Sequence, residues 1–263
     1  MRIPRLHLLE LEDLSGLPNS CRSFVTDALR LIAEKLQVYA AVAPLMEELL
    51  STSQTSRVLD LCSGSGGPAL QLLEKLNTQT PVDLLLSDLA PPEDLLLSPP
   101  TSYYPQALDV RELTQHLSTN ELLQDRIWSC FNALHHQTQP TLTEIFHAAA
   151  QHSCGFIGVE VTQRSLWLML RMFPLTLLVW LTVPFIKPFR FSRVFWSYLL
   201  PLGIFVFFWD GVVSHLRSYR PEELLALAKG GDAEGRFEWS SGLCGTWWAP
   251  LVYVVGRPRL RGY

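Results

Sequence analysis

The sequence predicts an α/β fold built around a mostly parallel sheet. Three observations support this prediction. Short apolar runs alternate with stretches of helical periodicity, a glycine-rich turn follows the first run, and two strand-like runs near the C-terminus have no helix between them. Strands that alternate with helices are typical of parallel sheets. Two strands joined by a short connection pair in antiparallel fashion instead.

Five runs are predicted to form the parallel strands. They cover residues 57–61, 82–87, 107–110, 127–131 and 156–161. Pro68 stands where the helix after the first strand should begin, a favoured position because the N–H that proline lacks would be unpaired there. Toward the C-terminus, the pattern predicts a helix over 221–229 and an antiparallel hairpin with strands 236–240 and 251–256.

The N-terminal region is predicted to be helical over residues 20–50. Asn19 or Ser20 is expected to cap the first helix, because a short polar side chain accepts hydrogen bonds from the free N–H groups of the first turn. Pro44 is expected to interrupt the helical run, since proline inside a helix removes a backbone hydrogen bond. The polar stretch 51–56 is then a linker to the first strand.

Composition narrows the class of protein. Of the 263 residues, 17% are charged, against roughly 25% in a typical soluble domain, so either the core is large or apolar surface is exposed. The net charge of −4 argues against binding to nucleic acid. The five dispersed cysteines predict neither a disulfide framework nor a metal site, and they favour a reducing, cytoplasmic setting.

The glycine-rich turn at 60–67, DLCSGSGG, carries the clearest chemistry. Its glycines permit positive φ angles and close approach of a ligand, and the helix that follows offers free N–H groups to an anion. Asp60 ends the strand, where it is placed to meet a cationic amino group. Asp88 follows at the tip of the next predicted strand, where a carboxylate accepts the hydroxyls of a ribose. Asp109 lies one strand further and is placed for an adenine amino group, with the Val110 N–H facing the ring.

Two alternatives exist for this turn. It is either a tight strand-to-helix turn without a ligand, or a dinucleotide site, because Gly64, Gly66 and Ala69 also fit the pattern GxGxxA. A nicotinamide cofactor would place its pyrophosphate at the turn, where the carboxylate of Asp60 is an unfavourable neighbour. Asp60 therefore favours a cationic ligand, with an NAD-dependent oxidoreductase as the alternative.

These motifs resemble those of class I methyltransferases that depend on S-adenosylmethionine (SAM). The segment VLDLCSGSG at 58–66 is similar to their first motif, usually VLDLGCGTG. LSD at 86–88, DV at 109–110 and SCFNALHH at 129–136 resemble later motifs. Cys62 replaces the first glycine, which predicts a less extreme backbone angle there. The resemblance implies a Rossmann-like, seven-stranded sheet with an antiparallel C-terminal hairpin and SAM as the methyl donor.

The resemblance also implies which residues form the sites. The donor site would comprise Asp60, Cys62, Ser63, Gly64, Ser65, Gly66, Asp88, Leu89, Asp109, Val110 and Phe131. A base is needed only when the acceptor must lose a proton. His135 and His136 follow the fourth strand, and Glu160 and Asp210 are further candidates for a catalytic role. A non-catalytic SAM-binding module is the alternative to an enzyme.

More narrowly, the chain resembles a bacterial branch of this class. Its members carry DLCSGxGGP, PFIxPFRxSR and WDGxxSxLRxYxPxEL, here at 60–68, 184–193 and 209–224. This predicts one methyltransferase domain over 1–263. Its parts are a helical N-terminal cap (1–50), a SAM-binding core (51–163), an apolar helical insertion or lid (164–218), and the last helix and hairpin (219–263).

The insertion contains two apolar runs, 166–186 and 194–209. The first is long enough to span a bilayer, which takes about 20 residues. A membrane hairpin fits poorly, because the second run is shorter and because the cations between the runs would have to lie outside. We expect a helical lid that contacts a membrane surface through 166–209, with a lid packed as ordinary core as the alternative. Either lid predicts a small, hydrophobic or lipid-like acceptor. The expected location is the cytoplasm, including peripheral or integral attachment to the inner membrane.

Overall fold

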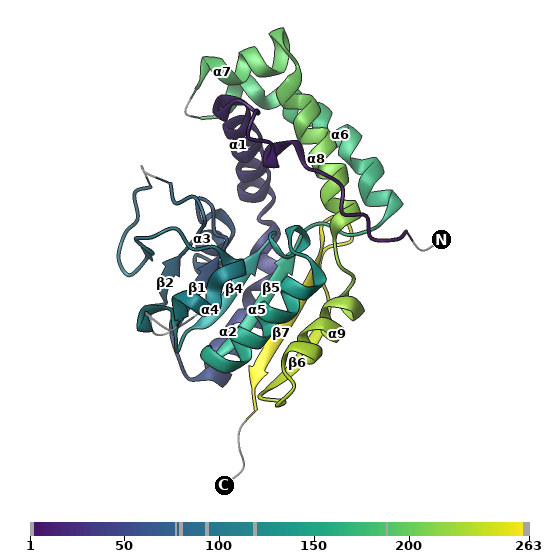
Figure 1. Ribbon diagram of the computed structural model, residues 1–263. Coiled ribbons are helices and arrows are strands. Elements are labelled where there is room, and N and C mark those ends of the chain that lie inside the picture. The colour runs from purple at the N-terminus through teal and green to yellow at the C-terminus, as the bar shows by residue number, and fades with distance from the viewer. Residues whose placement is uncertain are drawn as a thin grey trace. The chain divides into compact units, whose positions relative to one another are not determined.

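A seven-stranded sheet forms the centre of one of two compact units in the computed structural model (Figure 1). The structure describes residues 3–76, 78, 81–92, 95–117, 120–187 and 189–259, without the side chain of Glu34. The sheet unit comprises Val38–Val161 and Arg220–Tyr263. The helical unit comprises Met1–Gln37 and Thr162–Tyr219, so the first 37 residues group with the apolar insertion.

The sheet has the strand order β3-β2-β1-β4-β5-β7-β6. The first five strands are parallel, and β7 is antiparallel to both of its neighbours. This arrangement confirms the predicted fold class. The strands are β1 (Arg57–Leu61), β2 (Asp83–Leu86), β3 (Ser102–Tyr103), β4 (Ile127–Phe131), β5 (Gly155–Glu160), β6 (Phe237–Gly245) and β7 (Pro250–Pro258).

Helices cover both faces of the sheet (Figure 1). On one face, α5 contacts both α4 and α9, and on the other the 3-10 helix η2 contacts both α2 and α3. These elements are η2 (Val38–Val42), α2 (Ala43–Ser53), α3 (Gly67–Leu73), α4 (Leu113–Leu117), α5 (Gln139–His152) and α9 (Pro221–Gly231). Short 3-10 turns η3 (Val110–Glu112), η4 (Glu121–Leu123) and η5 (Leu134–His136) complete the unit. With both faces covered, the central strands are buried along their length, which explains their continuous apolar runs.

The third strand lies elsewhere than predicted. Strand β3 is Ser102–Tyr103, and the predicted run 107–110 instead ends in the 3-10 turn η3. The side chain of Asp109 accepts a hydrogen bond from the Arg111 N–H, and this local cap gives the backbone an alternative to a sheet ladder. The prediction failed because an apolar run is compatible with a buried turn as well as with a strand.

The N-terminal helices also differ from the prediction in their ends. Helix α1 spans Asn19–Leu36 with Pro18 at the capping position, so neither Asn19 nor Ser20 caps it. The helix ends where Gln37 adopts a left-handed backbone, well before Pro44. Pro44 lies in the first turn of α2, where its missing N–H removes no helical hydrogen bond. Helix α2 continues through Ser53, into the stretch predicted as a linker.

The helical unit has a hydrophobic core of its own. Its elements are the 3-10 turn η1 (Leu11–Asp13), α1, α6 (Leu166–Thr182), the 3-10 turn η6 (Val183–Phe185), α7 (Phe191–Val194), the π-helical turn η7 (Phe195–Leu199) and α8 (Leu202–Arg217). Buried side chains of α1, α6 and α8 pack together, among them Phe24, Met172 and Phe207. Gly211 lies directly against the end of the Met172 side chain, so a larger residue at this position would have to displace that side chain.

Candidate functional site

The turn between β1 and α3 has a left-handed backbone at three positions. The φ angles are 56° at Cys62, 53° at Gly64 and 77° at Gly66. The prediction of a less extreme backbone angle at Cys62 is therefore wrong, because this residue keeps the positive φ typical of glycine. The Cys62 thiol hydrogen-bonds that of Cys130 on β4, and together with burial this raises the pKa of Cys130.

Backbone hydrogen bonds hold the turn against the neighbouring strand end. The Ser63 N–H donates to the Ser87 carbonyl at 2.8 Å, and the Gly66 N–H donates to the Ser63 carbonyl at 2.7 Å. Gly64 and Ser65 are exposed, whereas Gly66 is buried. The turn is thus fixed at its base and open to solvent at its crest, as a site for a small ligand requires.

Asp60 is the penultimate residue of β1, and its carboxylate is buried. Its Oδ1 accepts a hydrogen bond from the Ser129 hydroxyl at 2.6 Å, because the register of β1 and β4 places Asp60 beside Ser129. Burial raises its pKa from 3.8 to about 7, against the opposing effects of hydrogen bonds from Ser129 and Ser63, and the charge of Asp88 raises it further. An incoming cation would favour the ionised form.

Asp88 follows β2 and points back to the turn. Its Oδ2 accepts the Gly64 N–H at 2.8 Å, and its Oδ1 accepts the Ala90 N–H at 2.9 Å. A carboxylate has about four lone-pair sites, so each oxygen can accept one further hydrogen bond. The structure thus brings Asp60 and Asp88 together at adjacent strand ends, as predicted from their spacing.

The other predicted donor-site residues take varied positions. Asp109 lies near the tip of β2, since the Leu108 N–H donates to the Asp88 carbonyl at 2.9 Å. Its carboxylate is engaged by the Arg111 side chain, which lowers its pKa. Val110 and Phe131 are buried, whereas Leu89 is exposed. Adenine would therefore meet a carboxylate already paired with a guanidinium.

Sequence reasoning missed several polar side chains around the turn. Tyr103, on β3, donates its hydroxyl to the Gly64 carbonyl at 3.0 Å. The Ser87 hydroxyl donates to the Asp60 carbonyl at 2.8 Å, and the Ser129 hydroxyl to the Asp60 side chain. Hydroxyl residues within or directly after three successive strands were the available signal.

His135 and Glu160 form a buried pair at the ends of β4 and β5. The Nδ1 of His135 lies 2.5 Å from Oε2 of Glu160, and Oε1 of the same carboxylate accepts the Leu134 N–H at 2.7 Å. Both side chains are almost wholly buried. The ring of His136 lies against that of His135, with centroids 4.2 Å apart. A carboxylate on Nδ1 fixes the imidazole proton on that nitrogen and orients the ring.

Asn132 and Tyr39 brace the loop that carries this pair. The side-chain Oδ1 of Asn132 accepts the Val161 N–H at 2.9 Å, and its side-chain NH₂ group donates to the buried hydroxyl of Tyr39. Asn132 has a left-handed backbone, with φ of 53°. Burial raises the pKa of Tyr39, so its hydroxyl stays protonated. This bracing explains how the chain turns sharply after β4.

Asp210 lies on α8 of the helical unit. Its two carboxylate oxygens accept the N–H groups of Leu11 and Glu12 at 2.6 and 2.9 Å. The carboxylate thus caps the first turn of η1 from within α8. This contact accounts for a buried acid after an apolar run without assigning it a chemical step.

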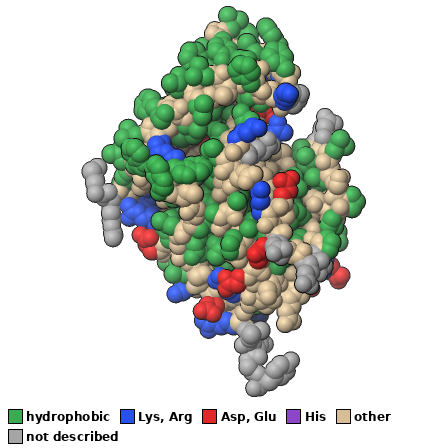
Figure 2. All heavy atoms as spheres, turned by 180° about the vertical axis from the view of Figure 1, so that it is seen from behind, with side chains coloured by type: hydrophobic (Ala, Val, Ile, Leu, Met, Phe, Trp, Pro, Cys, Tyr) green, Lys and Arg blue, Asp and Glu red, His purple; other side chains and the backbone are tan. Residues whose placement is uncertain are grey.

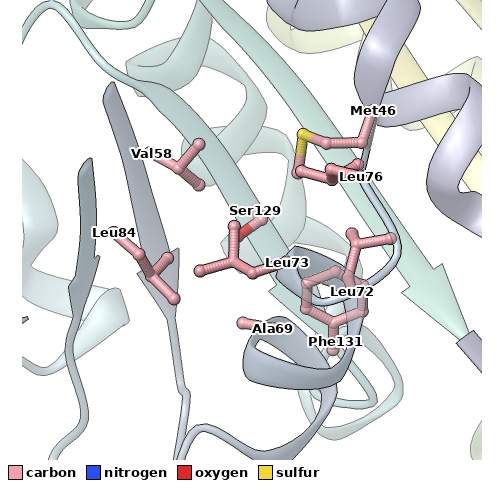
Figure 3. Close-up of a pocket in the computed structure, with 9 residues that line it drawn as sticks. All are labelled: Met46, Val58, Ala69, Leu72, Leu73, Leu76, Leu84, Ser129 and Phe131. Carbon is pink, nitrogen blue, oxygen red and sulfur yellow. The ribbon is translucent and has the colours of Figure 1, made fainter. Parts of the chain in front are cut away.

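An apolar pocket lies beneath α3, on the face of the sheet that α2 and α3 cover (Figure 3). Aliphatic side chains from α2, α3, β1 and β2 line it with Phe131, and Ser129 is the polar residue among them. The Ser129 hydroxyl is already committed to Asp60. Since a charged ligand needs several polar partners, this pocket is a packing gap and not the donor site.

Two glycines of the turn make a matched test of its geometry. A Cβ at Gly66 would lie 2.6 Å from Leu86 Cδ1, whereas a Cβ at Gly64 would meet nothing within 4 Å. We expect Gly64→Ala to lower the free energy of unfolding by about 1–2 kcal/mol, from the left-handed backbone alone. Gly66→Ala should lower the free energy of unfolding by about 1–3 kcal/mol more than Gly64→Ala, because its Cβ overpacks against Leu86. Urea unfolding measures both, and equal losses would show that Leu86 moves aside without cost.

Comparison with solved structures identifies methyltransferases of similar fold. A plantazolicin methyltransferase in complex with SAH is 11% identical with a TM-score of 0.45, and the match covers 92% of this chain and 98% of that one. Human N-acetylserotonin methyltransferase in complex with SAM is 11% identical with a TM-score of 0.47, covering 92% and 67%. Mitomycin 7-O-methyltransferase is 12% identical with a TM-score of 0.40, covering 90% and 55%. The sequence matches no family model and no curated protein.

Proposed function

We propose that this chain is a SAM-dependent methyltransferase of class I, with the donor bound at the β1–α3 turn. One observation carries the proposal. Asp60 and Asp88 lie at adjacent strand ends on either side of a turn with three left-handed residues. A carboxylate for an ammonium group, N–H groups for a carboxylate and a second carboxylate for ribose hydroxyls match the polar groups of SAM.

Charge favours SAM over a nicotinamide dinucleotide at this turn. Two carboxylates lie close enough for the charge of Asp88 to raise the pKa of Asp60. They attract a ligand with an ammonium and a sulfonium group and repel a pyrophosphate. Calorimetric titration with SAM, SAH, NAD and NADH tests this, and binding of a nicotinamide cofactor in preference to SAM would overturn the proposal.

We assign the catalytic role to His135, positioned by Glu160. Methyl transfer is an in-line displacement at the sulfonium methyl carbon, and the enzyme contributes chiefly by holding the two reactants in line. Where the acceptor must lose a proton, the imidazole of His135 would take it. Glu160 holds the proton of this ring on Nδ1. His136 is the alternative base, with its ring against that of His135.

The acceptor is proposed to be small and hydrophobic or lipid-like, with contact to a membrane through 166–209. Support comes from the apolar surface of the helical unit, where Trp167, Phe173 and Phe185 are exposed. Incubation with labelled SAM and extracts of lipids or quinones should release S-adenosylhomocysteine. SAM binding without turnover in any extract would favour a non-catalytic binding module.

Titration of Asp60 predicts a pH dependence of donor binding. Its pKa is about 7 in the folded chain, so the ionised form that pairs with an ammonium group becomes populated as the pH rises toward 7. The dissociation constant for SAM should therefore fall by up to about tenfold per pH unit between pH 5.5 and 7. Asp60→Asn keeps an oxygen that accepts from Ser129 but cannot ionise. The affinity of this variant for SAM should therefore be weak and independent of pH over this range. A wild-type affinity for SAM that does not change with pH would contradict the pairing of Asp60 with the ammonium group.

The same titration predicts a change in stability with the opposite sign. Because the folded pKa is raised above 3.8, the folded chain holds a proton that the unfolded chain has lost. The free energy of unfolding should therefore decrease as the pH rises from about 4 to 7, by at most about 4 kcal/mol from this group. In Asp60→Asn, this decrease of the free energy of unfolding with pH should vanish.

A further inference from the structure

We infer that the helical unit docks onto an anionic lipid bilayer and lies within one leaflet, with the outer face of α6 in the lipid. It deepens the membrane contact proposed above by assigning the lipid charge and the depth of insertion, and it does not depend on methyl transfer. The outer face comprises the exposed residues of α6.

Helix α6 carries apolar side chains on its inner and outer faces, with Thr176 as a polar residue of the inner face. Its inner stripe, Leu168, Met172, Thr176 and Val179, is buried. Every exposed position of the helix is also apolar, including Leu166, Trp167, Leu170, Phe173, Leu177 and Leu181. The 20-residue segment Leu166–Phe185 is long and apolar enough to cross a membrane, yet only 28% of its apolar stretch is buried. A core helix of a soluble protein would be mostly buried, so this outer face lacks its partner.

The apolar surface continues beyond α6. Phe185, Phe189 and Phe191 follow it with exposed fractions of 78%, 63% and 73%, and Phe205 and Trp209 are exposed on α8. Figure 2 shows hydrophobic side chains gathered over the helices of this unit. A surface of this extent, formed by several elements, is larger than the scattered exposed apolar residues of an ordinary soluble domain.

Charge identifies the partner as an anionic bilayer. From residue 161 to 209 the sequence has no Asp or Glu but five cations: Arg164, Arg171, Lys187, Arg190 and Arg193. Lys187 and Arg190 are exposed between the three exposed phenylalanines. Arg190 also lies 3.6 Å from Asp27, and Arg193 is buried against the same carboxylate. Aromatic and basic side chains interleaved in this way suit the headgroup region, where they meet apolar chains and lipid phosphates together.

The sheet excludes a single crossing of the membrane. Strand β5 precedes α6 in the chain, and β7 follows α8, yet the two strands are hydrogen-bonded neighbours. The chain must therefore return to the side from which it left. The return segment is bent by 80° at the break between Phe191–Leu199 and Leu202–Arg217, which is the geometry of a broken or re-entrant segment and not of a straight span. Within α8, Asp210, His215 and Arg217 are buried polar residues engaged inside the unit. The helices thus enter one leaflet and do not cross it.

Sedimentation with lipid vesicles tests the inference. We expect the full chain to pellet with vesicles of equal parts phosphatidylcholine and phosphatidylglycerol, and at least tenfold less with phosphatidylcholine alone. The triple variant Trp167→Gln, Leu170→Gln, Leu177→Gln should bind the anionic vesicles at least tenfold more weakly. A matched triple variant, Trp247→Gln, Leu122→Gln, Leu243→Gln, changes residues of the sheet unit that are at least as exposed, and it should bind like the wild type.

Three results would overturn the inference. They are no pelleting of the wild type, equal loss in both triple variants, and a stable dimer in lipid-free ultracentrifugation that the α6 variant alone dissociates. The last result would assign the face to a second copy of the chain. Equal urea midpoints for the two variants exclude misfolding as the cause of a loss. Asp88→Ala, designed to lose SAM, should still pellet, so failure of the donor site and failure of docking are distinguishable.

Discussion

Replacement of Asp88 by alanine is expected to raise the dissociation constant for SAM by about 10²- to 10⁴-fold. Hydrogen bonds to a charged group contribute roughly 1.5–3 kcal/mol each. Two ribose hydroxyls would lose their acceptor, and about 1.4 kcal/mol corresponds to each factor of ten. The variant also releases the N–H groups of Gly64 and Ala90. Isothermal calorimetry with SAM measures the change directly.

The control for this experiment is Glu74→Ala. Glu74 is exposed at the far end of α3 from the turn, so its removal subtracts the same charge from the unit without touching the strand tips. Its affinity for SAM should stay within about twofold of the wild type, because exposed charges are well screened over such a separation. Equal affinities for wild type and Asp88→Ala would place the donor elsewhere or exclude SAM.

Glu160→Gln is expected to lower kcat by about 10²- to 10⁴-fold while SAM affinity stays unchanged. The amide oxygen can still accept the Leu134 N–H, so the NH₂ group faces Nδ1 of His135. The ring then accepts at Nδ1 and carries its proton on Nε2, where a base needs a lone pair. Release of S-adenosylhomocysteine under saturating SAM and an identified acceptor measures kcat, and calorimetry measures donor affinity.

Two further variants separate chemistry from folding. Glu144→Gln makes the same chemical change on the exposed side of α5 and should leave kcat unchanged. His135→Ala should lower kcat about as much as Glu160→Gln, and the double variant no further, because the two residues act as a unit. Additive losses, or full activity in a folded Glu160→Gln protein, would remove the pair from the mechanism.

The strand predictions were accurate for strands whose residues are buried on both faces of the sheet. Strands β1 and β4 span the predicted residues 57–61 and 127–131, because both faces of a central strand are covered and its sequence becomes a continuous apolar run. Strand β3 was missed because Ser102–Tyr103 is a two-residue edge strand with no such run. Neighbouring strands and helices, rather than local sequence, decide whether so short a segment pairs.

The sequence by itself determined the parallel α/β plan, the glycine turn and the acids at two strand tips, since these depend on local periodicity and backbone preference. Only the tertiary structure decided the partners of those acids. Ser129 reaches Asp60 across 69 residues, and Glu160 meets His135 across 25. It also grouped residues 1–37 with 162–219 around a separate core. Such pairings follow from strand register and helix packing, which depend on the burial of many side chains together and leave no signal in any single segment.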